Sequence, residues 1–545
     1  MYKLGIDVGG TNTDGAILDE DLNVLSSFKS PTTDDIETGI NNVIEKLLKD
    51  ITIDKNKIKH AMLGTTQCTN AIVTRKGLDK VATIRIGLPA GAAIEPLYDV
   101  PNDLKEKLGT YVYQVAGGHE FNGELISDLD VEKLKEIAKE ITGKVDSISI
   151  TSIFSPVNNI HEIEAAKILR PLVGKELPIS LSSEIGSLGL LERENATVLN
   201  SAIQTVAEKT INGFEKALRK HGIPATPYFC QNDGTLMSKE YTLKYPILTV
   251  ACGPTNSLRG ASYLSEFEDA IIVDIGGTTT DIGVLQRGFP RESSISVELS
   301  GVQTNFRMPD IYSIALGGGT IVKGDINSIK IGPESVGYQL PKKALIFGGD
   351  TLTTTDIAVA KGFLNLGDKD KISHLDSSFV DAVYQEMIKM IEVAVEKMKT
   401  SKDDVPVVLV GGGSALIKEN STIQGASTVA NPKSGSVANA IGSAISDVSG
   451  EVEKVVNISV DTRESVIGEL KKLAIDDAVE AGAVREKTEV ITFDEIPLAY
   501  LPGGATHVKV KSAGPLKWFY LTQREFKSLF VFLCLINPIH ILSFI

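Results

Sequence analysis

Hydrophobic and polar positions in the first third of the chain alternate between the two periods typical of strands and helices. Short β-branched runs predict strands at 2–8, 14–19, 60–64, 80–86 and 146–153. Apolar residues spaced three and four apart predict helices near 36–50, 67–76, 130–143 and 161–170. Strand and helix in alternation indicate an α/β layered fold.

The second half of the chain repeats this alternation after a long helical stretch. We predict one helix from about Leu191 to His221, because residues 192–195 open it and Gly222 with Pro224 closes it. Asp376 is expected to cap a second long helix that runs to about Met398. Strands are predicted at 270–275, 282–285 and 406–410, followed by a small α+β unit over 451–516.

Two near-identical octapeptides stand between pairs of predicted strands. Residues 7–14 read Asp-Val-Gly-Gly-Thr-Asn-Thr-Asp, and residues 274–281 read Asp-Ile-Gly-Gly-Thr-Thr-Thr-Asp. Each copy is typical of a β-hairpin with a polar glycine tip, and turn chemistry alone explains one copy. Two copies in corresponding positions are better explained by an internal repeat.

The octapeptides have the residue types of a phosphate site. Paired glycines let backbone N–H groups approach an oxyanion, which points to Gly9, Gly10, Gly276 and Gly277. Hydroxyl donors come from Thr11, Thr13, Thr278 and Thr279. Carboxylates do not face phosphate directly, so Asp7 and Asp274 imply a divalent cation, Mg²⁺ or Mn²⁺, held partly through water. Two facing hairpins would clamp a nucleoside triphosphate, with Asp7 and Asp274 as the catalytic and metal-side residues.

Two further glycine runs follow predicted strands. Gly411, Gly412 and Gly413 precede a helix expected at Ala415, and free N–H groups at such a position bind nucleotides. A plain turn between strand and helix is the alternative. The run at 317–319 is left open between contact with phosphate or substrate and simple close packing.

Other polar residues have weaker assignments. Arg75 is a candidate for neutralising anionic charge, and Arg85 is a polar insert in a strand. His119 and His161 are isolated in the sequence, so we expect surface or capping roles for them.

Composition excludes several classes of protein. The formal net charge of −15 argues against a nucleic-acid partner, which requires a basic face. The cysteines lack the spacing of a zinc site or a disulfide framework, and no signal peptide precedes the first strand, so we expect a cytoplasmic location. The four cysteines are Cys68, Cys230, Cys252 and Cys534.

The composition changes at the end of the chain, where the only Trp, Trp518, lies. The apolar run there is shorter than the roughly 20 residues of a membrane helix and is interrupted at Pro538. We therefore expect no membrane partner. A tail anchor, a buried terminal segment and a divergent end of the gene are left open.

Several motifs together resemble the A-type, ATP-using component of the hydantoinase/oxoprolinase family. The matching stretches lie at 5–14, 63–66, 69–71, 75–77, 192–194, 197–200, 274–281 and 501–505. One departure is that the family's Ser-Gly-Pro-Ala-Gly-Gly stretch appears as Ala-Cys-Gly-Pro-Thr-Asn at 251–256. The resemblance implies two actin-like (ribonuclease-H-like) lobes with ATP between the duplicated hairpins.

The resemblance also implies a reaction and a partner. The expected activity is ATP-dependent phosphorylation and hydrolysis of a cyclic amide such as a hydantoin or 5-oxoproline. No hydrolase nucleophile is visible, so a B-type partner subunit is expected for ring opening, and a homo-oligomer is left open. The rival readings are an actin-like ATPase acting as a conformational or activator protein, and a sugar or carboxylic-acid kinase.

On this basis we predict four units. The N-terminal hydantoinase/oxoprolinase lobe covers 1–183, and the second, hydantoinase A lobe covers 184–450. The small α+β domain covers 451–516, and an atypical apolar tail covers 517–545.

Overall fold

The computed structural model describes residues 1–33, 35–293, 297–306, 308–418, 421–459, 461–498 and 505–517. Its largest element is a nine-stranded sheet in the order β22-β23-β21-β10-β9-β4-β1-β2-β3. The strands are β1 (Tyr2–Val8), β2 (Asn12–Leu18), β3 (Val24–Pro31), β4 (Ile58–Thr65), β9 (Thr226–Cys230), β10 (Leu236–Met237), β21 (Val448–Asn457), β22 (Glu489–Pro497) and β23 (Ala505–Gly514).

A second sheet repeats the arrangement around the first hairpin. Its strands are β11 (Ala270–Ile275), β12 (Thr280–Gln286), β13 (Phe289–Pro290), β16 (Ile311–Ile314), β19 (Val405–Val410) and β20 (Ala426–Ala430). In both sheets the hairpin's second strand pairs with an antiparallel strand, and its first strand is followed by two parallel strands. The predicted α/β fold with two actin-like lobes and duplicated hairpins is confirmed.

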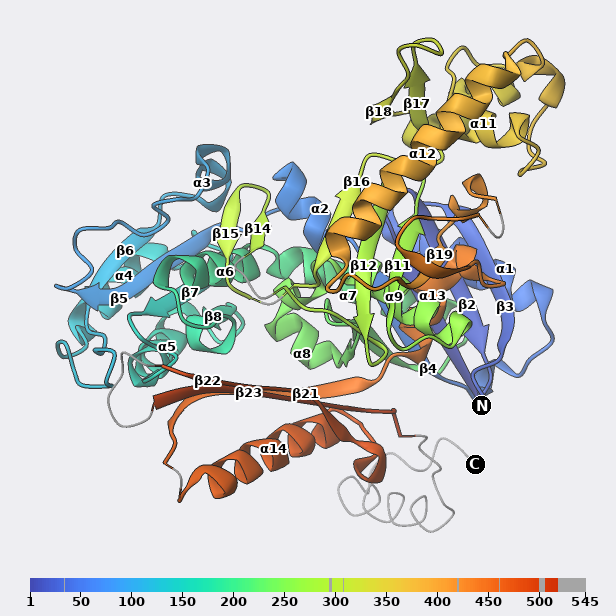
Figure 1. Cartoon of the computed structure of the whole chain (residues 1–545). Helices are drawn as coiled ribbons and strands as arrows, with labels where there is room; N and C mark the ends of the chain where they lie inside the picture. Colours follow the sequence, from blue (N-terminus) through green and yellow to red (C-terminus); the bar gives the residue numbers. More distant parts are fainter. Residues whose placement is uncertain are drawn as a thin grey trace.

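Two insertions extend the lobes (Figure 1). The larger one is a parallel sheet of β5 (Val81–Leu88), β6 (Val112–Ala116), β7 (Ser147–Ser152) and β8 (Ile179–Leu181) with α3 (Asn102–Leu108), α4 (Val131–Ile141) and α5 (Ile160–Val173). The smaller one pairs β17 (Thr320–Lys323) with β18 (Lys330–Ser335), beside α10 (Leu340–Lys343) and α11 (Thr354–Ala360). A separate hairpin joins β14 (Val297–Leu299) to β15 (Val302–Thr304).

The other helices cover the sheets or lie between them. They are α1 (Ile36–Asp50), α2 (Gln67–Thr74), α6 (Leu190–Ala202), α7 (Gln204–Lys220), α8 (Lys239–Lys244), α9 (Cys252–Ser265), α12 (Ser377–Met398), α13 (Ala438–Ile445) and α14 (Arg463–Glu480). The Asp376 cap is confirmed, since its carboxylate accepts from the Phe379 N–H over 3.0 Å. In Figure 1, α14 lies along the face of β21–β23 that points away from the two lobes.

Two predicted helices differ from the structure. The single helix over 191–221 is two helices, α6 and α7, that meet at Ile203. Asp79 satisfies the backbone groups freed by the break, because its N–H donates to Ala202 O over 2.8 Å and its carboxylate accepts from Thr205 N over 2.9 Å. Asp79, which is distant in sequence, therefore stabilises a helix break that no glycine or proline at Ile203 marks. The helix expected at Ala415 is only a short 3₁₀ turn, Ser414–Leu416.

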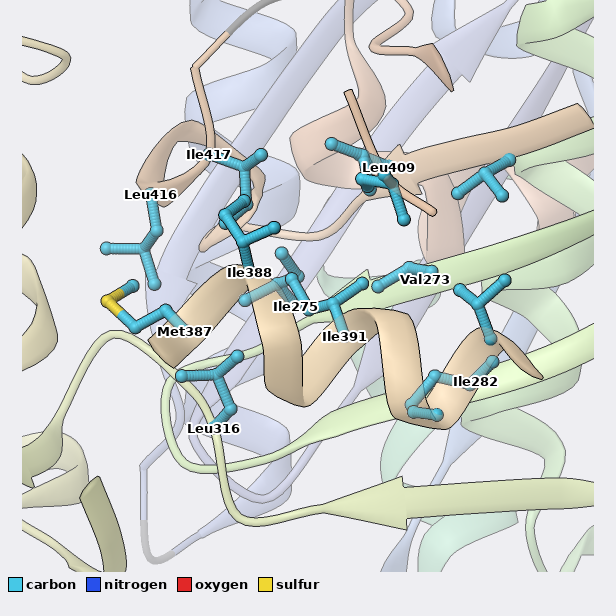
Figure 2. Packing of buried hydrophobic residues seen from close by; sticks show 14 of the residues in the cluster. Val273, Ile275, Ile282, Leu316, Met387, Ile388, Ile391, Leu409, Leu416 and Ile417 are labelled. Carbon is cyan, nitrogen blue, oxygen red and sulfur yellow. The ribbon is translucent and has the colours of Figure 1, made fainter. Parts of the chain in front are cut away.

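Alternation along the strands separates the core from the site. Val273 and Ile275 pack under α12 with Ile391 (Figure 2), so the intervening Asp274 points to the opposite face of the sheet. Ile6 and Val8 likewise pack in the core of the first lobe, which turns Asp7 to the other face. The same period of two therefore presents both carboxylates to the layer between the lobes.

The three strands of the predicted C-terminal unit continue the first sheet through the pairing of β21 with β10. Pairing between strands crosses both proposed boundaries, at 183/184 and at 450/451, and the division into units stays a prediction. Residues 501–504 of the last family motif and residues 518–545 of the tail lie outside the described residues. Within the described ranges, none of the helices is both long and apolar enough to cross a bilayer.

Candidate active site between the two lobes

The two hairpins close with the same turn and meet at their tips. The Gly9 N–H donates to Asn12 O over 2.9 Å, and the Gly276 N–H donates to Thr279 O over 2.9 Å. A methyl group on Gly277 would lie 3.6 Å from Cγ2 of Thr11. The tips predicted to bind phosphate therefore lie next to each other where the two lobes meet.

Asp7 is buried at the base of the first hairpin. Its Oδ1 accepts from Nδ2 of Asn256 over 3.0 Å, and its Oδ2 accepts from Nδ2 of Asn439 over 3.0 Å. A methyl group on Gly64 would lie only 2.3 Å from Oδ1, so glycine is required beside the carboxylate. Burial raises the pKa of Asp7 to about 6, and the two amide donors oppose that shift.

Lys29 provides positive charge that sequence reasoning missed. It lies opposite Asp14 in the register of β2 and β3, and its Nζ is 2.6 Å from Asp14 Oδ1. The Asn439 amide donates to Asp14 as well, over 2.6 Å, and so bridges the two carboxylates of the hairpin. The strand 24–31 was not predicted, and its register with the hairpin was the signal that would have identified Lys29.

Asp274 occupies the corresponding position in the second hairpin but is more exposed than Asp7. Desolvation raises its pKa to about 6, a hydrogen bond from Ser257 opposes the shift, and the nearby charge of Asp281 adds to it. A methyl group on Gly411 would lie 2.1 Å from Asp274 Oδ1. Gly411 therefore makes room for this carboxylate as Gly64 does for Asp7.

Two helices, α9 and α13, cross between the sheets and carry the donors to both carboxylates. Their backbones approach so closely that a methyl group on Gly260 would lie 1.9 Å from Ala438 O, and one on Gly442 would lie 1.8 Å from Asn256 O. The departure from the family motif, at 251–256, lies at the start of α9. Asn256 therefore faces Asp7 from the helix that separates the lobes.

The predicted tip residues fall into two groups. Gly10, Thr278 and Thr279 are exposed, and Gly9, Thr11, Gly276 and Gly277 are partly exposed, so all seven are accessible to solvent. Thr13 is fully buried, with its hydroxyl 3.3 Å from the Thr32 hydroxyl, behind the hairpin. The Thr32 hydroxyl in turn donates to Gly9 O over 2.8 Å, which links Thr13 to the shape of the tip.

The other glycine runs pack against the second hairpin. The Gly413 N–H donates to Ile275 O over 2.7 Å, while Gly412 is exposed, with Lys29 as its nearest neighbour. From the 317–319 run, the N–H groups of Gly318 and Gly319 donate to Gly276 O and Gly277 O over 3.0 and 2.7 Å. These hydrogen bonds agree with close packing, which was one of the two alternatives for the 317–319 run.

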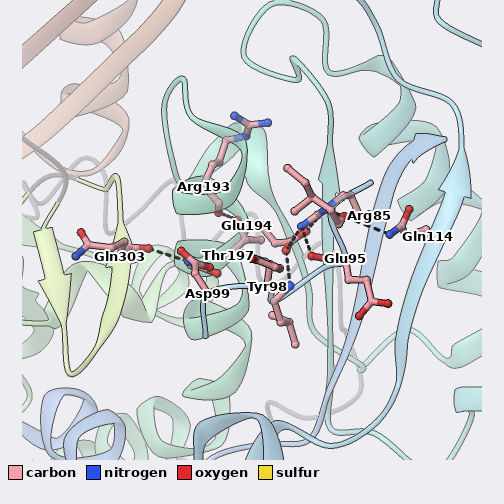
Figure 3. Close-up of polar contacts among 12 residues, drawn as sticks. Arg85, Glu95, Tyr98, Asp99, Gln114, Arg193, Glu194, Thr197 and Gln303 are labelled. Atoms are coloured by element: carbon pink, nitrogen blue, oxygen red, sulfur yellow. Dashed lines mark hydrogen bonds and ion pairs between the residues drawn. The ribbon is translucent and has the colours of Figure 1, made fainter. Parts of the chain in front are cut away.

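The side chains of Arg75 and Arg85 both bind other groups of the protein. Arg75 donates to Ser300 O over 2.7 Å and pairs with Asp103. Arg85 forms a buried two-pronged ion pair with Glu194, with both N–O distances 2.6 Å (Figure 3). These guanidinium groups hold segments of the N-terminal half of the chain together, with Arg75 also binding the β14–β15 hairpin.

The two histidines do not have the expected surface positions. His119 and His161 are buried with ring centres 4.5 Å apart, and the Gly118 N–H donates to His161 Nδ1 over 2.9 Å. Burial lowers the pKa of both imidazoles. The chain's fold, rather than its local sequence, brings them together.

The donor set fits a cation that is shared with a ligand. Among the described residues, no group of three or more His, Cys, Asp or Glu side chains could hold a metal ion by itself. Asp7 and Asp274 nevertheless lie beside two glycine tips whose N–H groups suit phosphate. Mg²⁺ is usually bound by one or two carboxylates together with substrate phosphates and water, which matches this arrangement.

Comparisons with known proteins identify relatives along most of the chain. It is 26% identical to the uncharacterized protein MJ0964 of Methanocaldococcus jannaschii, over 91% of this chain and 79% of that protein. It is 22% identical to caprolactamase subunit alpha of Pseudomonas jessenii, over 73% of this chain and 60% of the relative. It is 25% identical to 5-oxoprolinase 1 of Arabidopsis thaliana, over 66% of this chain and 31% of the relative. The chain thus spans less than two thirds of both named enzymes.

Solved structures agree on the fold. The ATP-dependent caprolactamase from Pseudomonas jessenii aligns with a TM-score of 0.75 and 18% identity, over 95% of this chain and 88% of that one. A nucleotide-free acetone carboxylase structure aligns with a TM-score of 0.63 and 17% identity, over 94% of this chain and 88% of the other. At these identities the likeness concerns the architecture.

Two family models match successive parts of the chain. The hydantoinase/oxoprolinase N-terminal region matches residues 3–173, which contain the first hairpin. The hydantoinase/oxoprolinase model matches residues 193–369, which contain the second hairpin. The resemblance inferred from the motifs is confirmed, and the chain belongs to the hydantoinase/oxoprolinase family.

Proposed function

We propose that this protein binds ATP between the Asp7 and Asp274 hairpins and uses it to phosphorylate a cyclic amide for hydrolysis. The observation that carries the proposal is the meeting of two glycine tips, each backed by an aspartate whose pKa is raised to about 6. Relatives named for caprolactam and 5-oxoproline support a lactam as the acceptor. The proposed substrate class is cyclic amides such as a hydantoin or 5-oxoproline.

The tip residues have distinct roles in this proposal. The N–H groups at Gly10 and Gly277 bind phosphate oxygens, and the accessible hydroxyls of Thr11, Thr278 and Thr279 add donors. Thr13 supports the first tip from behind through Thr32. Exposed Gly412 is the part of the 411–413 run that is open to the nucleotide.

A divalent cation, when bound, neutralises charge that develops on the transferred phosphoryl group. Asp7 and Asp274 would hold it, partly through water. Lys29, close to Asp14, contributes a further positive charge at the same place.

The chemical step is a phosphoryl transfer. The amide carbonyl oxygen attacks the γ-phosphorus, the bond to the bridging oxygen of ADP breaks, and ADP leaves. The phosphorylated amide carries a good leaving group at the former carbonyl carbon. Water then adds to that carbon, and the C–N bond breaks as the ring nitrogen takes up a proton, which opens the ring and leaves an acyl phosphate. A second water hydrolyses the acyl phosphate to a carboxylate and inorganic phosphate.

A partner subunit is part of the proposal. The two relatives aligned over the whole fold are enzymes, and the caprolactamase relative is itself named as a subunit. We assign ring opening to a B-type hydantoinase/oxoprolinase subunit, with this chain as the ATP-using component.

The test is ATP hydrolysis by the purified chain with Mg²⁺ or Mn²⁺, with and without a B-type subunit. 5-Oxoproline, hydantoin, caprolactam and acetone are added separately, and phosphate and ring-opened product are both measured. Stimulation by one cyclic amide supports the proposal, and stimulation by acetone alone moves the acceptor to ketones. Tight ATP binding without any stimulation, even with the partner, contradicts it in favour of a conformational ATPase.

A further inference from the structure

One turn of α9 contacts a carboxylate from each lobe. Asn256 donates to Asp7 of the first hairpin over 3.0 Å, and Ser257, the next residue, hydrogen-bonds to Asp274 of the second. Both side chains are almost fully buried, at 0% and 4% exposure. The separation between the two carboxylates is therefore tied to one short piece of helix.

That piece of helix is held rigidly. The backbone of α13 lies against it where a methyl group on Gly442 would come within 1.8 Å of Asn256 O. From α13, Asn439 reaches the other oxygen of Asp7 and also Asp14, over 3.0 and 2.6 Å. Each oxygen of Asp7 thus has one amide donor, and the plane of the carboxylate is fixed by two crossing helices.

We infer that Asn256, Ser257 and Asn439 are positioning residues that set Asp7 and Asp274 on the two sides of a nucleotide-bound divalent cation. A carboxylate has about four lone-pair sites, so one donor on each oxygen leaves the second site free for water on a cation. This inference rests on the proposed function, because it concerns the cation that accompanies ATP.

A purely structural role makes a different prediction. A buried asparagine that only binds a carboxylate outside the site affects stability and has no connection with the cation. Asn195 provides that control, because it is 1% exposed and donates Nδ2 over 3.0 Å to the exposed residue Asp99, away from the hairpins. Ser265, whose hydroxyl donates to Ala261 O within α9, is the corresponding control for Ser257.

The experiment measures ATP affinity by titration calorimetry in EDTA and in Mg²⁺, so that the gain due to the cation is obtained for each variant. Asn256→Ala, Asn439→Ala and Ser257→Ala are compared with Asn195→Ala and Ser265→Ala. We expect the three site variants to lose about 10-fold of the Mg²⁺-dependent gain, because each removes a hydrogen bond to a charged group. The affinity for metal-free ATP, which depends on the glycine tips, stays the same, and both controls keep the full gain.

The outcomes separate this inference from the proposed function. A wild-type chain that gains no ATP affinity from Mg²⁺ overturns the proposed site and this inference together. A wild-type gain that the three site variants retain overturns the inference alone. Should Asn256→Ala fail to fold, as judged by thermal midpoint, the smaller change Ser257→Ala, which acts on the carboxylate of the other lobe, still decides the question.

Discussion

The two hairpins have nearly the same sequence and the same backbone, yet their carboxylates lie in different surroundings. Asp7 is 3% exposed and is held by two amides, and its strand neighbour Asp14 is paired with Lys29. Asp274 is more exposed, and hydroxyl groups serve it and its strand neighbour Asp281. The repeated octapeptide therefore determines the hairpin turn, while segments outside the repeat determine the polar and charged groups around each carboxylate.

This difference suggests a division of labour. In the first hairpin, two amides fix the carboxylate of Asp7, and Lys29 neutralises the charge of Asp14. The second hairpin is more open to solvent and carries the accessible threonines, Thr278 and Thr279. Variants that alter both hairpins in the same way reveal whether the two halves contribute equally.

The largest expected effect comes from the carboxylates themselves. Asp7→Asn and Asp274→Asn each remove a ligand of the proposed cation while they keep the side-chain volume. Because a cation contributes several kcal/mol to such a transfer, ATP turnover should fall by about 100-fold or more in each variant. Steady-state turnover with Mg²⁺ measures this, and wild-type turnover in both variants would refute the assignment of the site.

The next effect concerns the glycines that make room for the carboxylates. Gly64→Ala and Gly411→Ala place a methyl group 2.3 and 2.1 Å from Asp7 and Asp274. Overpacking of this kind costs about 1–3 kcal/mol of stability. Gly411→Ala should be the worse of the two, because Gly411 also has φ +84°. Thermal midpoints of the two variants test this order, and equal midpoints would show that the backbone of the second lobe relaxes.

A smaller effect is expected at the exposed tips. A methyl group on Gly10 meets nothing within 4 Å, and one on Gly277 makes only an ordinary contact with Thr11. Gly10→Ala and Gly277→Ala should therefore keep the thermal midpoint of the wild-type chain. Their ATP affinity should fall about 10-fold, because a methyl group keeps phosphate away from the N–H groups. Unchanged affinity in both variants would place the phosphates elsewhere.

The smallest effect is a pH dependence of stability. Burial raises the pKa of Asp7 from 3.8 to about 6, so the folded state binds a proton more tightly than the unfolded state. This group adds stability below pH 6 and loses that contribution as the pH rises through 6, and at pH 5 the gain is about 1.4 kcal/mol. Asp7→Asn should lose the gain.

The measurement is the difference in thermal midpoint between the wild-type chain and Asp7→Asn at pH 5 and pH 8. The wild-type chain should improve relative to the variant at pH 5. Asp274→Asn should show a similar effect, because burial raises the pKa of Asp274 to about 6 as well. A difference that is the same at both pH values would mean that Asp7 is ionised throughout.

The sequence predicted the two repeated hairpins and the alternation of side chains along their strands. The hairpins follow from glycine pairs between β-branched runs, and the inward direction of Asp7 and Asp274 follows from the strand period of two. Contacts between distant segments could not be predicted in this way. Asn439 lies 432 positions from the carboxylate that it binds, and the break at Ile203 depends on Asp79.

Isolated polar residues were the least informative part of the sequence. Arg75 was a candidate for neutralising an anionic ligand and Arg85 was only a polar insert in a strand, and the fold supplies each with buried or backbone partners. Lys29, which has no motif around it, lies at the centre of the site instead. A charged side chain acquires its role from the strand register that places it, and that register was not predicted for 24–31.

The central claim, that both hairpins clamp one nucleotide, is tested most directly by hydrogen–deuterium exchange with and without Mg²⁺ and ATP. Amides at the two tips, residues 10–11 and 277–279, exchange in the free chain because these residues are exposed or half-buried. The account predicts that ATP protects both segments together, with no comparable change at the Arg85–Glu194 pair. Protection of only one tip, or of neither, would contradict it.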